Sequence, residues 1–224
     1  LRFNFLMKLN LIRINVTANY ISTAFLLLIS VITVPYFLNT LGSAAYGLIG
    51  FFALLQNILS VFDLGFSQLL GRHAAIAKSR IEEFNFFADL LKTFEVYAFF
   101  LLSIILVTFI PISSALAEHW FQSEVLTIEV IRSSIQVMFI CGALQMYIRL
   151  YKATVIGFED QVWENSFSIF ISALKYIGAL LFIWFISDNI VHFFMYQLAI
   201  IFVEIIGFRI KVYKSLPAGL DLRI

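Results

Sequence analysis

The stretch from Val96 to Ala117 reads VYAFFLLSIILVTFIPISSALA and contains no charged residue. A bilayer core about 30 Å thick needs roughly 20 residues of helix for one crossing, and this stretch is that long. Pro111 lies close to its end and predicts a kink or an end of the helix in the last turns. The stretch therefore predicts a transmembrane helix.

The whole chain has the composition of a membrane protein. Of its 224 residues, 62% are hydrophobic and only 13% are charged, and the mean hydropathy is +0.96. A soluble domain of this length has no interior large enough for that much apolar surface. The net charge of +1 and the short basic clusters argue against a nucleic-acid partner. The single cysteine, Cys141, has no partner for a disulfide and no metal-ligating neighbours.

Five further charge-poor stretches of similar length lie on either side of this helix, bounded by charges or turn residues. The six predicted spans are residues 14–38, 45–70, 96–117, 130–151, 166–187 and 189–208. The sequence thus predicts an all-α fold, a polytopic membrane helix bundle in which residues 1–224 form a single six-helix lobe.

Lys and Arg residues are distributed on one side of this six-span arrangement. The loops 39–44 and 118–129 on the other side contain neither, and short basic loops stay in the cytoplasm. We therefore expect a plasma membrane protein with both termini cytoplasmic. Trp120 and Phe121 fit the outer interfacial belt and Trp163 the inner one, while 84–95 is typical of an interfacial helix before the third span.

Polar side chains recur at helical spacing within three of the spans, and we expect these faces to turn towards one another or towards a water-filled cavity. The alternative explanation for the Ser, Thr and Asn positions is ordinary packing between membrane helices. The three faces are Asn15, Asn19, Ser22, Ser30 and Thr33; Ala53, Gln56, Ser60, Asp63 and Ser67; and Ser168, Ser172, Lys175 and Ala179.

Three ionisable residues within the spans are the strongest candidates for function, because an ionisable group in a membrane costs about 2.5 to 3.5 kcal/mol on insertion scales. Lys175 lies near mid-plane, where it either contacts an anionic substrate or pairs with Asp63 or Glu204. Asp63 alternatively caps a helix break at Gly65. Glu204 lies about one turn from Arg209 and alternatively pairs with it at the interface. Asp63 and Glu204 are also candidates for coupling to an ion.

Motifs for catalysis and metal binding are missing from the sequence. It contains no Gly-rich phosphate loop, no HExxH or Cys/His metal spacing and no GxSxG sequence. We therefore expect no enzymatic activity, no cofactor and no metal site.

Several short motifs lie at the ends of the predicted spans. Pro35-Tyr36 precedes Leu41-Gly42 and Tyr46-Gly47, and Asp63-Leu64-Gly65-Phe66 is followed by Arg72. Gly157-Phe158-Glu159-Asp160 precedes the fifth span, which contains Lys175. In order and spacing these motifs resemble polysaccharide-biosynthesis membrane proteins of the O-antigen flippase type, in the multidrug/oligosaccharidyl-lipid/polysaccharide exporter superfamily. The resemblance covers nearly the whole chain.

The resemblance implies transport of a lipid-linked oligosaccharide, such as an O-antigen or polysaccharide repeat unit on undecaprenyl pyrophosphate, across the bacterial inner membrane. Candidate substrate-binding residues are Lys175, Asp63, Asn19, Gln56 and Ser172. Relatives often carry a basic residue shortly before the Leu-Gly pair, where this chain has Asn39, and they have two related lobes. We therefore expect a missing second lobe or a homodimer.

Two other functions remain open at this stage. A multidrug or cation exporter of the same superfamily would use Asp63 or Glu204 for proton or sodium coupling, and a carboxylate-rich cavity would favour it. A membrane-embedded glycosyl polymerase is the other alternative, and the sequence lacks the large outer loop that such an enzyme would need.

Overall fold

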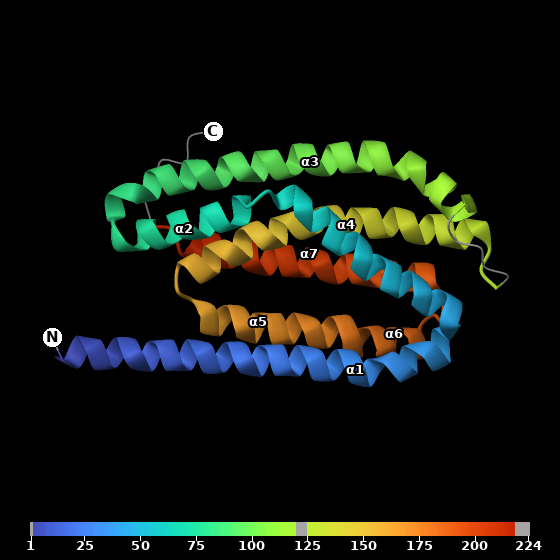
Figure 1. The fold of residues 1–224 in the computed structure, drawn as a ribbon, viewed down its shortest axis with the longest axis horizontal. Coiled ribbons are helices and arrows are strands. Elements are labelled where there is room, and N and C mark those ends of the chain that lie inside the picture. The colour runs from blue at the N-terminus through green and yellow to red at the C-terminus, as the bar shows by residue number, and fades with distance from the viewer. Residues whose placement is uncertain (1, 120–124, 218–224) are drawn as a thin grey trace.

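The computed structural model describes residues 2–119 and 125–217, and every regular element in these ranges is a helix (Figure 1). Helices satisfy their own backbone hydrogen bonds, as a chain in lipid must. The elements are α1 (Arg2–Ser60), η1 (Val61–Asp63), α2 (Phe66–Ser79), η2 (Ile81–Glu83), α3 (Phe84–His119), α4 (Ile128–Gly157), α5 (Gln161–Ala173), η3 (Leu174–Gly178), α6 (Ala179–Phe185) and α7 (Ile190–Lys214). The predicted all-α bundle is confirmed.

Five helical stretches of the described residues are long and apolar enough to cross a membrane: Arg13–Asp63, Ile81–Glu118, Ile128–Gly157, Gln161–Phe185 and Ile190–Lys214. The first of them makes two crossings, because the chain reverses at Gly42 (Figure 1). Gly42 has φ 83° and ψ 165°, a conformation that a residue with a Cβ atom rarely adopts. The described residues therefore form a helix bundle with the length and apolar character for six membrane crossings.

Two predicted boundaries differ from the structure on the first half of the chain. The first helix continues through Pro35 to the reversal at Gly42, beyond the predicted end at residue 38. The second crossing breaks at Leu64 and Gly65, which have φ 48° and 82°, and resumes as α2 to Ser79 rather than ending at residue 70. Propensity alone does not end a helix at Gly71-Arg72, because α2 packs there against α4.

The region around the third crossing also requires a correction. The segment 84–95 forms no separate interfacial helix; it is the first part of α3, and its apolar side chains Phe87, Leu91 and Phe94 are buried. Pro111 does not end α3, which continues to His119. The apolar face of this segment packs against the bundle rather than lying at the membrane interface as predicted.

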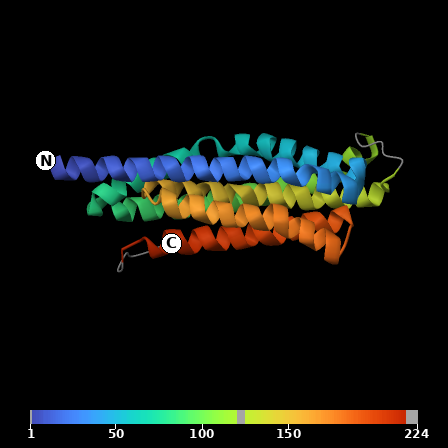
Figure 2. The ribbon, with the colours of Figure 1, turned by 90° about the horizontal axis from the view of Figure 1, so that it is seen from below.

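Successive crossings alternate in direction, so that the chain reversals gather at two ends of the bundle (Figure 1). The start of α1, the α2–α3 and α4–α5 connections and the end of α7 lie at one end, and a perpendicular view places both ends of the described chain there too (Figure 2). We call this the basic end, because Arg72, Lys78, Arg80, Lys211 and Lys214 lie on its elements. These five residues follow the predicted one-sided distribution, whereas Arg132 lies near the start of α4 at the opposite end.

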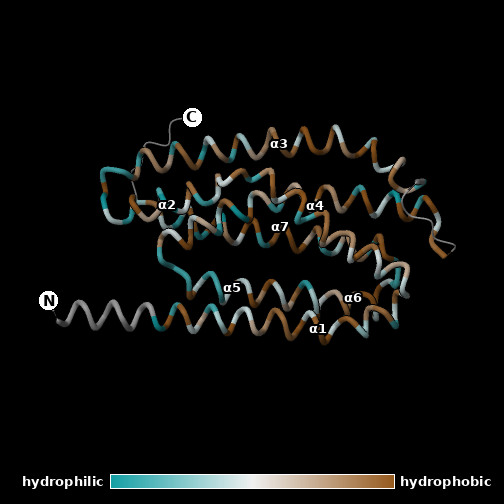
Figure 3. The backbone as a smooth tube through the Cα atoms, viewed as in Figure 1, coloured by the Kyte–Doolittle hydropathy of each residue, from teal (hydrophilic) through white to brown (hydrophobic). Residues whose placement is uncertain are grey.

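Hydropathy follows the same division, with apolar residues along the helices and hydrophilic residues at the α2–α3 and α4–α5 connections (Figure 3). Trp163 lies near the start of α5 at the basic end, as predicted. Trp120 and Phe121 lie outside the described residues.

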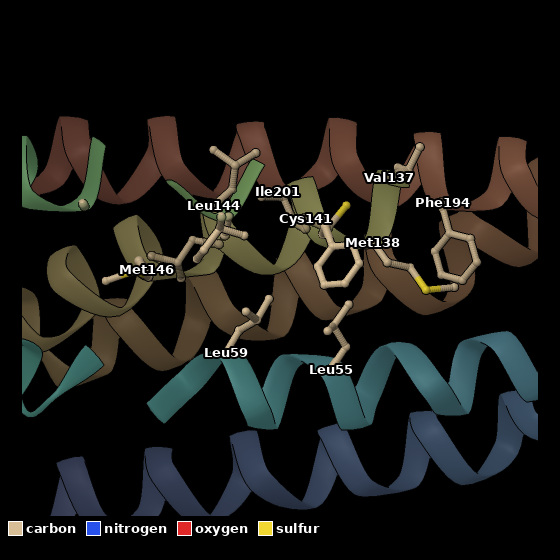
Figure 4. Close-up of a cluster of buried hydrophobic side chains, with 14 of the residues drawn as sticks. Leu55, Leu59, Val137, Met138, Cys141, Leu144, Met146, Phe194 and Ile201 are labelled. Carbon is tan, nitrogen blue, oxygen red and sulfur yellow. The ribbon is translucent and has the colours of Figure 1, made fainter. Parts of the chain in front are cut away.

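Helix α4 is the centre of the bundle and packs against α1, α2, α3 and α7. Figure 4 shows side chains of its apolar core, where Leu55 and Leu59 face Met138 and Cys141. At the basic end α2 and α4 cross almost backbone to backbone, since a Cβ atom on Gly157 would collide with the Gly71 carbonyl oxygen. Such small-residue contacts are how membrane helices approach closely. This crossing fixes α2 in register with α4.

Candidate functional site

A cavity of about 590 Å³ lies among five of the six crossings. It is bounded by both arms of α1, by α4 at Gln145, by the α5–η3 segment and by α7. Its polar lining residues are Ser30, Thr33, Tyr46, Gln56, Gln145, Ser172, Lys175, Tyr176 and Gln197, and apolar residues such as Phe37, Phe52 and Phe193 complete the wall. The cavity therefore offers amides, hydroxyls and aromatic rings inside a membrane-embedded bundle.

The cavity joins residues from all three predicted polar faces. Ser30 and Thr33 come from the first face, Ala53 and Gln56 from the second, and Ser172 and Lys175 from the third. The expectation that these faces turn towards one another is confirmed for these positions. Their roles in binding a substrate stay predictions.

Lys175 forms an ion pair with Glu204 of α7, with 2.5 Å between Nζ and Oε2. The two side chains are 22% and 11% exposed, so the pair is largely buried. Of the alternatives left open by the sequence, the structure thus shows the pair with Glu204, and Glu204 does not pair with Arg209. Arg209 instead lies over the ring of Tyr213, 5.4 Å from its centroid.

The backbone around Lys175 is a π-helix, η3, inserted between α5 and α6. Such single π turns widen a helix locally and often occur at functional sites. Two side chains of α7 bind the carbonyls there: the Tyr196 hydroxyl donates to the Leu174 oxygen at 2.9 Å, and Gln197 Nε2 donates to the Lys175 oxygen at 2.8 Å. Gly178 leaves room for the Tyr196 hydroxyl, which a Cβ atom would meet. Helix α7 therefore fixes both the side chain and the backbone of Lys175.

The remaining predicted site residues lie elsewhere. Asn19 is exposed on α1, and neither Asn19 nor Asp63 lines the cavity. Asp63 ends η1, where its Oδ1 accepts a hydrogen bond from the Ser67 hydroxyl at 2.6 Å. The N-cap position of α2 is Gly65, and no side chain caps it. Asp63 thus lies at the predicted break but binds a side chain rather than the backbone of α2.

A second ion pair, in which Glu164 is buried and the Lys152 side chain is 42% exposed, continues the polar face of α5 towards the basic end. Lys152 Nζ lies 2.7 Å from Glu164 Oε1, and the Ser168 hydroxyl donates to the same oxygen at 2.8 Å. Ser172 donates to the Ser168 carbonyl at 2.6 Å. The serines of this face are thus satisfied within the helix, as the packing explanation predicts.

Three residues of interest escaped the sequence reasoning. Gln145 and Gln197 line the cavity, and as single amides in otherwise apolar helices they carry no periodic signal. Arg149 is one of the Lys and Arg residues on the predicted cytoplasmic side, and its Nε and Nη2 are buried and have no hydrogen-bond partner among the described residues. Arg149 lies only two residues inside the predicted end of its span at residue 151, so nothing in the pattern indicated a buried guanidinium.

A third polar cluster ties α3, α4 and α7 together away from the cavity. The Glu95 carboxylate accepts hydrogen bonds from the Tyr151 hydroxyl at 2.6 Å and from the Tyr213 hydroxyl at 3.1 Å to each oxygen. The Tyr147 hydroxyl donates to the Glu95 carbonyl at 3.3 Å. Because its members come from α3, α4 and α7, the cluster fixes three crossings to one another.

The motifs quoted from the sequence coincide with interruptions of the helices. Leu41-Gly42 forms the reversal of α1, Asp63-Leu64-Gly65-Phe66 forms the break before α2, and Gly157-Phe158-Glu159-Asp160 forms the turn from α4 to α5. The chain matches no protein-family model, no curated protein and no solved structure. The function is therefore inferred from the cavity and its lining residues.

Proposed function

We propose that this chain is a lobe of a transporter that moves a lipid-linked oligosaccharide, such as an O-antigen or polysaccharide repeat unit, across the bacterial inner membrane. The observation that carries the proposal is the cavity of about 590 Å³ inside the helix bundle. A purely anchoring bundle has no need for a polar cavity at membrane depth, since unpaired polar groups there are costly. The volume lies within the range of about 300 to 1,000 Å³ typical of small-molecule sites.

The chemistry of the lining favours a glycan. The carboxamides of Gln56, Gln145 and Gln197 offer both donors and acceptors, which match the hydroxyl groups of a sugar. Phe52 and Phe193 offer apolar ring surface for the faces of a sugar ring. The cavity thus pairs polar and apolar contacts as an oligosaccharide requires.

The charge of the cavity supports the same substrate and bears on the role of Lys175. Lys175 is the single ionisable Lys, Arg, Asp or Glu residue among the described lining residues, and Glu204 neutralises it. An anion bound beside Lys175 would have to displace that carboxylate. We therefore assign to Lys175 the role of positioning the cavity wall. We assign the uncharged glycan, rather than a pyrophosphate, to the cavity.

The multidrug or cation exporter alternative has less support. A cation site needs carboxylates facing the cavity, and the described lining contains no Asp or Glu. Glu204, the carboxylate that contacts Lys175 of the lining, is already paired with that lysine.

Binding to the intact chain in lipid nanodiscs tests the proposal. A lipid-linked oligosaccharide should bind, and Gln56→Leu and Gln197→Leu should each weaken binding about tenfold, by the loss of hydrogen bonds to the glycan. The matched control is Gln136→Leu, because Gln136 lies on α4 outside the cavity and donates to Ser113. Absence of binding, or an equal loss in the control, would overturn the proposal.

A further inference from the structure

Arg149 stands apart from the paired cations inside the described bundle. Lys152 and Lys175 each have a carboxylate within 2.7 Å. Arg149 has none within ion-pair distance among the described residues, and its buried Nε and Nη2 bind no acceptor there. Buried N–H groups without acceptors are rare in proteins and point to a missing ligand, water or ion. Arg149 is thus a cation with two hydrogen-bond donors that have no acceptor among the described residues.

The fold places Arg149 next to the break before α2. A Cβ atom on Gly71 would meet the Ala153 carbonyl, so Gly71 lies opposite Ala153 where α2 and α4 run side by side. One turn earlier on each helix, Ser67 and Arg149 are correspondingly opposed. The first N–H groups of α2 point towards this level, and Gly65 supplies no side-chain cap for them. The uncapped N-terminus of α2 and the guanidinium therefore lie at about the same depth.

The same arginine is close to the cavity. Arg149 follows Gln145 by four residues on α4, so both lie on one face of the helix, one turn apart. Gln145 lines the cavity. Arg149 also lies eight residues before the end of α4, about 12 Å from the basic end of the bundle. A ligand in the cavity can thus reach Arg149 by extending one helical turn towards that end.

We propose that Arg149, with the N-terminus of α2, binds a phosphate-bearing anion, the pyrophosphate of the lipid-linked substrate whose glycan occupies the cavity. This inference rests on the proposed function and assigns the two parts of the substrate to two places. The planar guanidinium presents Nε and Nη2 on one edge, and two donors on one edge match two oxygens of a phosphate. Helix N-termini bind the same groups through their N–H donors and dipole.

Asp63 is the acidic residue that acts electrostatically on Arg149. Its Oδ1 is occupied by the Ser67 hydroxyl, and no ion pair joins it to Arg149. Its negative charge opposes a second anion beside Arg149, since like charges repel. Removing that charge should therefore tighten binding of the anion, whereas a structural Asp63–Arg149 pair predicts loss of stability and no gain in binding.

The experiment measures the affinity of the full chain in neutral-lipid nanodiscs for inorganic pyrophosphate, for undecaprenyl pyrophosphate without sugar, and for nanodiscs doped with phosphatidylglycerol. Arg149→Gln should weaken pyrophosphate binding at least tenfold, Arg149→Lys should retain part of it, and Asp63→Asn should tighten it about fivefold. The control is Lys78→Gln, which removes an exposed cation from its pair with Glu159 outside the cavity and should leave pyrophosphate binding unchanged. Stronger binding of undecaprenyl pyrophosphate than of phosphatidylglycerol identifies the substrate rather than bulk lipid as the source of the anion.

Equal affinity of wild type and Arg149→Gln, weaker binding in Asp63→Asn, or loss of binding in Lys78→Gln would overturn the assignment. If Arg149→Gln does not fold, Arg149→Lys and Asp63→Asn still decide it. Failure of this inference is distinct from failure of the proposed function, because oligosaccharide binding that depends on Gln56 and Gln197 is measured separately and survives it.

Discussion

Lys175 on η3 and Glu204 on α7 lie 2.5 Å apart and cancel each other's charge at the wall of the cavity. The pair joins two segments separated by 29 residues, and both side chains are largely buried. Removing one member of a buried pair leaves an uncompensated charge, which costs more than the pair itself contributes. The pair is therefore a sensitive position for stability.

Glu204→Gln should lower the free energy of unfolding by about 3 kcal/mol, and Lys175→Gln/Glu204→Gln should recover most of that loss, because no charge is left unpaired. Thermal unfolding in detergent measures both. The matched control is Glu159→Gln, which breaks the exposed Lys78–Glu159 pair and should cost less than about 1 kcal/mol. A double variant less stable than the single one would contradict this account.

The π-helix should depend on the hydroxyl of Tyr196. Tyr196→Phe removes the donor to the Leu174 carbonyl and should destabilise the protein by about 1 to 2 kcal/mol, since that carbonyl is left without its partner. Tyr20→Phe is the control, because Tyr20 is 73% exposed on α1. Equal melting temperatures of the two variants would show that η3 does not need this hydrogen bond.

The crossing of α2 and α4 should not tolerate even one methyl group. Gly157→Ala places a Cβ atom against the Gly71 carbonyl oxygen and should cost about 1 to 3 kcal/mol by overpacking. Gly47→Ala is the control, because no atom lies within 4 Å of the position its Cβ would take. Melting temperatures of the two variants give the comparison, and an unaffected Gly157→Ala protein would mean that the helices separate readily.

The cluster around Glu95 should behave as a unit. Tyr151→Phe removes a 2.6 Å hydrogen bond to a carboxylate and should cost about 1.5 to 3 kcal/mol. Tyr213→Phe removes a hydroxyl shared between both carboxylate oxygens. In a double-mutant cycle the two losses should differ from additivity by at least about 0.5 kcal/mol, since both hydroxyls bind one group. Strict additivity in thermal unfolding would show that the two tyrosines act independently.

The fold was largely predictable because membrane helices must be apolar and long, and both properties can be read locally. The reversal at Gly42 and the break near Asp63 were placed correctly to within a few residues, since Gly and charged residues mark them. The extension of α2 to Ser79 and of α3 back to Phe84 was missed, because burial against α4 stabilises polar helix ends that pattern alone assigns to water.

The site was predictable only where polar residues repeat along one helix. Gln56, Ser172 and Lys175 were found in that way, and all three line the cavity. The sequence did not decide which residue pairs with Lys175, because Asp63 and Glu204 both lie in apolar stretches. The packing of η3 against α7 selects Glu204. Gln145, Gln197 and the orphaned donors of Arg149 depend on contacts between helices and have no local pattern.

The orientation of the bundle should follow its basic end, which we expect in the cytoplasm because Lys and Arg retain short loops there. Alkaline phosphatase, active only after export, should be active when fused after Gly42 or Asp188, which lie at the reversals of the opposite end, and inactive after Lys78, Lys152 or Lys214. As a control, fusions of a cytoplasm-active reporter at the same positions should give the reverse pattern and exclude differences in expression. Phosphatase activity after Lys152 would contradict the orientation, because Lys152 lies on α4 about one and a half turns before its end at the basic end.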